Sequence, residues 1–167
     1  MYTIDDIRDI AVQIERNGEA AYRSAGKKAA DAELAGLLEW MADEERRHAK
    51  WFENLAVRDR MVLPEHGDME AMGRSLLQEM VKNQTFSLNG EQLETADNVD
   101  ELLTQSMDFE QDTILFYDML KSFVEDKQTA AQLDMIIDEE RGHVTLLKKL
   151  RKRLINGIDI DYSHLKK

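Results

Sequence analysis

The hexapeptide DEERRH at residues 43–48 is repeated, with one letter changed, as DEERGH at residues 138–143. Each copy contains a Glu-x-x-His motif, and residues three apart share one face of an α-helix. Both copies lie in stretches rich in strong helix formers. The repeat therefore predicts two helices that present the same pair of polar side chains at equivalent places.

The repeat extends beyond the hexapeptides. The offset of 95 residues that relates them also relates Glu110 to Glu15 and Tyr117 to Tyr22. In both halves the upstream glutamate precedes the glutamate of the Glu-x-x-His motif by 30 residues. Because a helix rises ~1.5 Å per residue, these equal spacings predict two hairpins of equal dimensions. Each hairpin is expected to hold its two glutamates at one height above its turn.

Composition and periodicity predict an all-α fold. The chain of 167 residues has one proline and eight glycines, and 43% of its residues are hydrophobic, which is enough to form a core. Capping residues and apolar stripes predict four helices, which make two consecutive hairpins. The predicted helices cover about residues 3–26, 32–58, 98–125 and 127–156.

The segment at residues 59–97 separates the two predicted hairpins. Adjacent helices in a simple up-and-down bundle need only short loops. A connection of this length predicts a crossover along the bundle, and a contact in a dimer is an alternative use of it. We expect residues 1–167 to form a single domain, with residues 59–97 as the inter-hairpin connection.

The charged residues of the repeat fall on apolar seams of the predicted helices. Burying four carboxylates without compensation is prohibitive, because each desolvated ion costs several kcal/mol. Two divalent cations would balance four negative charges, and two imidazoles would complete the site. A dimetal site in a helical bundle takes one Glu from each of two helices and Glu-x-x-His from each of the other two. The predicted metal ligands are Glu15, Glu45, His48, Glu110, Glu140 and His143.

The predicted ligands have different roles. We expect Glu45 and Glu140 to bridge the two ions, Glu15 and Glu110 to be terminal ligands, and each histidine to bind one ion. Carboxylate and imidazole ligands suit iron and manganese and tolerate zinc. The residue types therefore leave the metal open.

Other polar residues surround the predicted site. Tyr22 and Tyr117 are candidates to orient the carboxylates by hydrogen bonds. Glu44 and Glu139 lie one residue off the seams, and we interpret them as surface groups or as supports for the ligands. Glu19 lies one turn beyond the first glutamate, and we expect it to pair with a nearby arginine at the surface.

Several classes of function are disfavoured by composition. The chain has no cysteine, which excludes a disulfide framework, a thiolate metal site and a catalytic thiol, and fits a cytoplasmic protein. The net charge of −12 argues against nucleic acid as a partner, because phosphate would be repelled. No segment approaches the ~20 apolar residues of a membrane span, and we identify no signal peptide.

The chain resembles the ferritin-like superfamily, and within it the rubrerythrin-like proteins. Four segments carry this resemblance, and each looks like one metal-binding helix of that family. They are IERNGEAAY from residue 14, EERRHAKWFENL from residue 44, FEQDTILFY from residue 109 and DEERGHVTLLKKL from residue 138. The resemblance covers the four helices and not the middle connection. It implies a ferritin-like four-helix bundle with two iron ions per chain.

There are two departures from the family pattern. Full-length rubrerythrins carry a C-terminal rubredoxin domain whose four cysteines hold one iron, and this chain contains no cysteine. Any such electron donor would have to be another protein. The family's third helix also commonly has a second glutamate three residues after the first, and here that position is Thr113. The remaining six-ligand set is closer to the ferroxidase centre of bacterioferritins.

The resemblance implies a non-haem di-iron oxidoreductase that reacts with peroxide or dioxygen, assembled as a homodimer and supplied by an external donor such as a rubredoxin. Two alternatives remain. In one, Fe(II) is itself the substrate, and the protein oxidises iron for storage or buffering. In the other, the metals only brace the helices. Assembly size distinguishes the first alternative, and redox turnover of the bound metal distinguishes the second.

Overall fold

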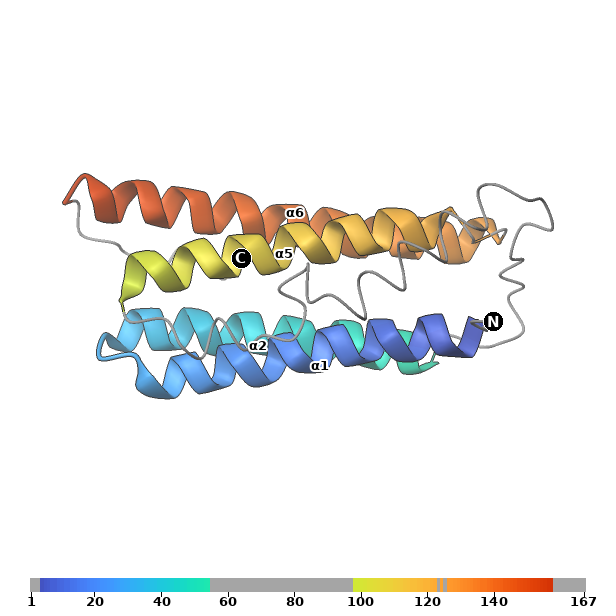
Figure 1. Ribbon diagram of the computed structural model, residues 1–167, viewed down its shortest axis with the longest axis horizontal. Helices are drawn as coiled ribbons and strands as arrows, with labels where there is room; N and C mark the ends of the chain where they lie inside the picture. Colours follow the sequence, from blue (N-terminus) through green and yellow to red (C-terminus); the bar gives the residue numbers. More distant parts are fainter. Residues whose placement is uncertain (1–3, 55–97, 123, 125, 158–167) are drawn as a thin grey trace.

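The computed structural model describes residues 4–54, 98–122, 124 and 126–157 of the chain. The described residues form four α-helices. They are α1 (Ile4–Lys28), α2 (Ala32–Asn54), α5 (Val99–Lys121) and α6 (Lys127–Ile155). In Figure 1, α1 pairs with α2 in one layer and α5 pairs with α6 in a second layer. The predicted all-α four-helix bundle of two hairpins is confirmed.

Three of these helices begin at side-chain caps that the sequence indicates. A carboxylate oxygen of Asp31 accepts a hydrogen bond from the backbone N–H of Leu34 at 2.7 Å. Asp126 does the same for Thr129 at 2.6 Å, and Asn98 caps α5. Such caps satisfy backbone donors that the first turn of a helix leaves without partners. Asp31 and Asp126 therefore start the second helix of each hairpin at equivalent positions of the repeat.

The third helix ends earlier than predicted. We expected it to reach about residue 125, but α5 ends at Lys121 with Ser122 as its C-cap. The backbone N–H and the hydroxyl of Ser122 both donate to the carbonyl of Met119, at 3.0 and 2.6 Å. These tight bonds replace the next helical turn. The predicted end of the second helix, near residue 58, lies outside the described residues.

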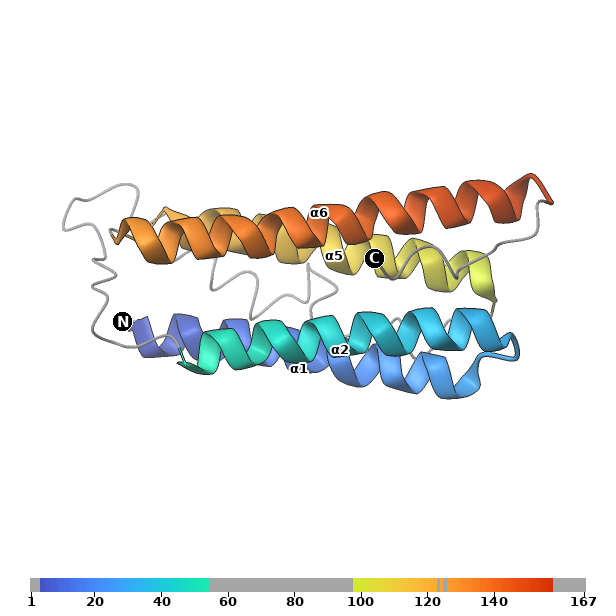
Figure 2. The ribbon, with the colours of Figure 1, turned by 180° about the vertical axis from the view of Figure 1, so that it is seen from behind.

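The order of the helix ends gives the topology. The turn between α1 and α2 and the turn between α5 and α6 lie at opposite ends of the bundle (Figures 1 and 2). The end of α2 and the start of α5 also lie at opposite ends, so these two helices run parallel. Ferritin-like bundles with one long connection have this arrangement. The route of residues 59–97 lies outside the described residues.

The core lies between the two hairpins. Its largest side chains with under 2% exposure include Phe52, Phe109, Phe116 and both buried tyrosines. Full burial of such a side chain stabilises the fold by roughly 1.5–3 kcal/mol. The apolar residues continue along each helix on both sides of a polar layer. None of the described helices is long and apolar enough to cross a membrane.

Candidate metal centre

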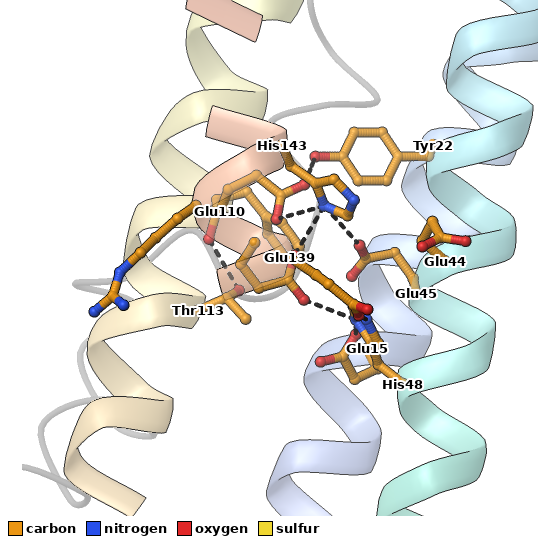
Figure 3. Close-up of polar contacts among 12 residues, drawn as sticks. Glu15, Tyr22, Glu44, Glu45, His48, Glu110, Thr113, Glu139 and His143 are labelled. Carbon is orange, nitrogen blue, oxygen red and sulfur yellow. Dashed lines mark hydrogen bonds and ion pairs between the residues drawn. The ribbon is translucent and has the colours of Figure 1, made fainter. Parts of the chain in front are cut away.

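The polar layer at the centre of the bundle contains all six residues predicted as metal ligands. Each hairpin contributes two glutamates and one histidine, and all four helices take part. The four glutamates are completely buried, and the histidines are at most 3% exposed. Figure 3 shows Glu45 and His48 of α2 facing Glu110 and His143 of the other hairpin. The two halves of the sequence repeat therefore meet at a single place.

The six side chains form two overlapping groups whose ligand atoms lie within 4.8 Å of one another. Glu15 and His48 belong to the first group only, and Glu110 and His143 belong to the second group only. Two glutamates, Glu45 and Glu140, belong to both groups. Each group draws on both hairpins, so neither hairpin could form one alone.

Glu140 lies between the two imidazoles. Its Oε1 is 2.7 Å from Nδ1 of His48, and its Oε2 is 2.9 Å from Nδ1 of His143. The same nitrogen of His48 is 3.5 Å from Oε2 of Glu15, and that of His143 is 3.7 Å from Oε2 of Glu110. Atoms that bind one ion at about 2.0–2.2 Å lie on the order of 3 Å apart. The shortest of these separations match that spacing.

The atoms that face the centre of the cluster make no well-aligned hydrogen bond, although some of them lie within ion-pair distance of one another. This holds for both carboxylate oxygens of Glu45 and Glu140, for one oxygen each of Glu15 and Glu110, and for Nδ1 of each histidine. Leaving so many buried polar atoms unpaired is costly. Carboxylate oxygen and imidazole nitrogen are ligands for iron, manganese and zinc. The residues present therefore fit two divalent cations, which would pair these atoms and balance the four carboxylates.

The pKa values of the cluster also indicate that positive charge stabilises it. Burial, with the nearby charge of Glu140, raises the pKa of Glu110 to about 7 and raises that of Glu45 well above its usual value. Burial alone would lower the pKa of His143, but Glu110 and Glu140 raise it to about 10. Without cations, protons supply the positive charge that the cluster requires.

Glu140 shifts in the opposite direction. Burial alone would raise its pKa, but the adjacent His48 and His143 hold it well below its usual range. The physical reason is its position between the two imidazoles, which stabilise its ionised form. Glu140 therefore remains a carboxylate while its neighbours take up protons.

Two buried tyrosines connect the hairpins across the cluster. Oη of Tyr22 on α1 donates to Oε1 of Glu110 on α5 at 2.5 Å. In the reciprocal contact, Oη of Tyr117 on α5 donates to Oε1 of Glu15 on α1. Burial and the neighbouring carboxylates raise the pKa of both phenols, so they keep their protons. Each tyrosine thus occupies one oxygen of a glutamate and leaves the other facing the cluster.

Gly18 makes room for one of the shared glutamates. A Cβ atom at this position would lie 2.7 Å from Oε2 of Glu45 and 2.9 Å from the ring of Phe109. The sequence analysis missed this contact, because the spacing of residues along one helix does not reveal how closely a second helix approaches. The repeat offset relates Gly18 to Thr113, so small or short side chains occupy both equivalent positions.

Thr113, at the position where the family commonly has a second glutamate, does not contribute a ligand atom to the cluster. The residue is buried, and its hydroxyl donates to the backbone carbonyl of Phe109 at 3.0 Å. Glu19, which we expected to pair with an arginine, does so with Arg23 at 2.9 Å. Neither residue joins the two groups at the centre.

The structure shows different contacts for Glu44 and Glu139, which the sequence analysis interpreted as surface groups or as supports for the ligands. Oε2 of Glu139 lies 2.8 Å from Nε2 of His48. Since an ionised carboxylate can only accept, this nitrogen carries the proton and Nδ1 faces the cluster. The hydrogen bond to His48, with Arg47, lowers the pKa of Glu139 to about 2. Glu44 instead pairs with Arg47 at 2.5 Å. Sequence reasoning did not single out Arg47, although it is the letter that differs between the hexapeptides.

Comparisons with known proteins agree with this geometry. A family model described as Rubrerythrin matches residues 6–151. A crystal structure from Thermotoga maritima, of a protein assigned as ferritin-like and diiron-carboxylate, superposes with a TM-score of 0.62 at 20% sequence identity. The match covers 90% of this chain and 95% of that chain, and it supports the fold. The search of curated proteins found no match.

Proposed function

Because the chain belongs to the rubrerythrin family, we propose that it is a non-haem di-iron carboxylate protein that exchanges electrons with hydrogen peroxide or dioxygen. The observation that carries this proposal is the buried cluster of six candidate ligand residues, whose inward atoms make no well-aligned hydrogen bonds. Iron is the metal named for the similar Thermotoga structure. Manganese and zinc suit the same ligands.

In the proposed centre each imidazole belongs to one ion. Glu15 and His48 would hold the first ion, and Glu110 and His143 would hold the second. Glu45 and Glu140 would be shared, since both belong to the two groups of ligand atoms. Two ferrous ions, when bound, supply the two electrons that reduce hydrogen peroxide, with two protons, to two molecules of water.

The protein's own residues prepare this place in three ways. Tyr22 and Tyr117 fix one oxygen of each terminal glutamate by hydrogen bonds, which limits rotation of the carboxylates. Burial of all six ligands excludes bulk water and strengthens their interaction with cations. The unpaired oxygens of Glu45 and Glu140 leave both shared carboxylates available to the cluster.

A second function is favoured by one observation. Thr113 stands where the family commonly has a further glutamate, and its hydroxyl is bonded to the backbone. The six-residue set that remains also suits oxidation of Fe(II) as a substrate. In that case the protein would handle iron rather than consume peroxide.

We further propose that the protein acts as a homodimer and receives electrons from another protein, such as a rubredoxin. The separate donor is proposed because none of the 167 residues is a cysteine, so the ligands of a rubredoxin-type iron are not among them. A dimer would support redox enzymology, whereas a hollow shell of many subunits would support iron storage. Measurement of the mass in solution distinguishes the two assemblies.

The test is anaerobic loading with Fe(II), followed by peroxide or dioxygen and optical detection of Fe(III). We expect two ferrous ions per chain to be oxidised, and Glu140→Ala to lose this reaction. Glu39→Ala, at an exposed position of the same bundle, is the matched control and should react normally. Continued peroxide consumption with excess reductant supports the peroxidase. Accumulation of Fe(III) beyond two per chain supports iron handling, and no oxidation at all refutes both.

A further inference from the structure

One letter differs between the two hexapeptides, and it lies beside the metal centre. Arg47 in the first copy corresponds to Gly142 in the second. A Cβ atom at Gly142 would meet no other atom within 4 Å, so the glycine is not required by crowding. The difference therefore places a charged side chain on one side of a pseudo-symmetric cluster and an open space on the other.

Arg47 connects α2 to α6 on the His48 side. One of its terminal nitrogens lies 2.5 Å from Glu44 and 2.9 Å from Glu139. Glu139 in turn lies 2.8 Å from Nε2 of His48, the nitrogen that faces away from the cluster. These contacts form a continuous chain from arginine to carboxylate to imidazole. Because two glutamates share one arginine, the net charge of the three side chains is −1, which does not repel a cation.

The His143 side lacks this support. By the repeat, Glu44 is the counterpart of Glu139, but it is held by Arg47 on its own helix. Among the described residues, no carboxylate forms an ion pair with Nε2 of His143. The ring of Trp40 lies edge-on to this imidazole instead, with centroids 5.4 Å apart.

We propose that the His48 half of the centre is the tighter cation position and fills first, and that Arg47 sets this order by holding Glu139 against His48. A carboxylate behind a metal-binding histidine fixes the orientation of the ring and makes its free nitrogen a better ligand. Loss of such a partner typically costs about 10–100-fold in metal affinity. The inference rests on the proposed dimetal function.

Calorimetric titration of Zn(II) into the metal-free protein tests the order of filling. Zinc is chosen because it is redox-silent, so no oxidation competes with binding. We expect two steps whose dissociation constants differ by about 10–100-fold. His48→Ala should remove the tight step and His143→Ala the weak one. Loss of the tight step in His143→Ala would overturn the proposal.

Two variants test the role of Arg47 without touching a ligand. Arg47→Ala and Glu139→Gln should each weaken the first step toward the second, so that the two merge. Arg46→Ala is the matched control, because Arg46 is similarly exposed and pairs only with Asp43 on its own helix among the contacts described. It should keep both steps. Circular dichroism checks that each variant is folded, and Glu139→Gln, which keeps size and shape, serves if Arg47→Ala does not fold.

The outcomes separate the order of filling from the centre itself. No zinc binding in the unaltered protein refutes the dimetal function and this inference together. Two ions that bind with one constant refute only the inference. Two separated steps that persist in Arg47→Ala and in Glu139→Gln show that these residues do not set the order. Separated steps in the unaltered protein that merge in both variants support the proposal.

Discussion

At the scale of single residues, the six side chains at the centre carry buried negative charge that the two imidazoles alone do not neutralise. Four buried carboxylates face two imidazoles, and the pKa values of Glu45, Glu110, His48 and His143 all rise. The metal-free fold must therefore bind protons that the unfolded chain releases. Cations and protons compete for the same atoms.

This competition makes stability depend on pH. His143 has a pKa of about 10 in the folded protein and 6.5 ordinarily, so its contribution is complete below pH 6.5 and is lost as pH rises through about 10. Glu110, raised from 4.5 to about 7, favours the folded state less as pH rises through that interval, which is the same sign. We expect the free energy of unfolding of the metal-free protein to fall between pH 6.5 and pH 10.

Urea unfolding at pH 6.5 and at roughly pH 9 measures this slope. His143→Gln should flatten it, because the glutamine does not titrate. Zinc-loaded protein should not show the loss, since cations then replace the protons and their affinity rises with pH. A metal-free protein that is more stable at the higher pH would contradict the expectation.

Variants of the two shared carboxylates distinguish one shared cage, in which both ions use Glu45 and Glu140, from two independent sites. Glu45→Ala and Glu140→Ala should each damage the binding of both ions, because each residue belongs to both groups of ligands. His48→Ala should mainly affect one ion, since its Nδ1 belongs to one group. Counting bound zinc by titration checks this. One tight site kept intact in both glutamate variants would refute the shared cage.

Gly18 gives a prediction about close packing. Gly18→Ala would place a methyl group 2.7 Å from a carboxylate oxygen of Glu45. Crowding of this kind typically costs about 1–3 kcal/mol. Gly26→Ala meets only ordinary contacts, and alanine is favoured over glycine in a helix by about 1 kcal/mol. We therefore expect Gly18→Ala to lower the free energy of unfolding and Gly26→Ala to preserve or raise it. Equal effects in the two variants would show that Gly18 has no special role.

At the scale of elements, an aspartate cap fixes where the second helix of each hairpin begins. We expect Asp31→Ala and Asp126→Ala each to lower the free energy of unfolding by about 1 kcal/mol. The two turns lie at opposite ends of the bundle (Figure 1), so the double variant should lose the sum. Asp108→Ala, at an exposed position inside α5, is the control. Urea unfolding compares the four variants, and a loss in Asp108→Ala as large as in the cap variants would rule out capping as the cause.

The elements also show how far the sequence could predict the structure. The 95-residue repeat, the caps and the apolar seams were enough to predict the four helices. They also predicted that the six polar residues meet, because the repeat places these residues on buried helix faces at matched heights. The end of α5 was wrong by about four residues, since the contacts of Ser122 with Met119 are local and have no periodic signal. The contact between Glu139 and His48 depends on which ring nitrogen faces outward, which spacing does not specify. The role of Gly18 depends on how closely its helix approaches the side chains of neighbouring helices, which only the packed structure shows.

At the scale of the whole molecule, the metal centre lies where the two hairpins meet. Direct contacts between the hairpins include the tyrosine–glutamate bonds of α1 with α5, and the contacts of Arg47 and His48 with Glu139 between α2 and α6. All of these surround the cluster. Cations at the centre would therefore act on the association of the hairpins rather than on either hairpin alone.

Metal loading should for this reason raise the melting temperature of the whole bundle. A ligand that binds only the folded state at 100 times its dissociation constant stabilises it by about 2.7 kcal/mol per site. For a domain of this size, 1 kcal/mol shifts the melting temperature by roughly 2–4 °C, so two filled sites correspond to roughly 10–20 °C. Scanning calorimetry with and without saturating Fe(II), Mn(II) or Zn(II) measures the shift, the iron samples being kept anaerobic. The double variant E45A/E140A, which lacks both shared carboxylates, is the control and should melt at the same temperature in both conditions. An unaltered protein whose melting temperature does not respond to any of the three metals would contradict metal binding at the cluster.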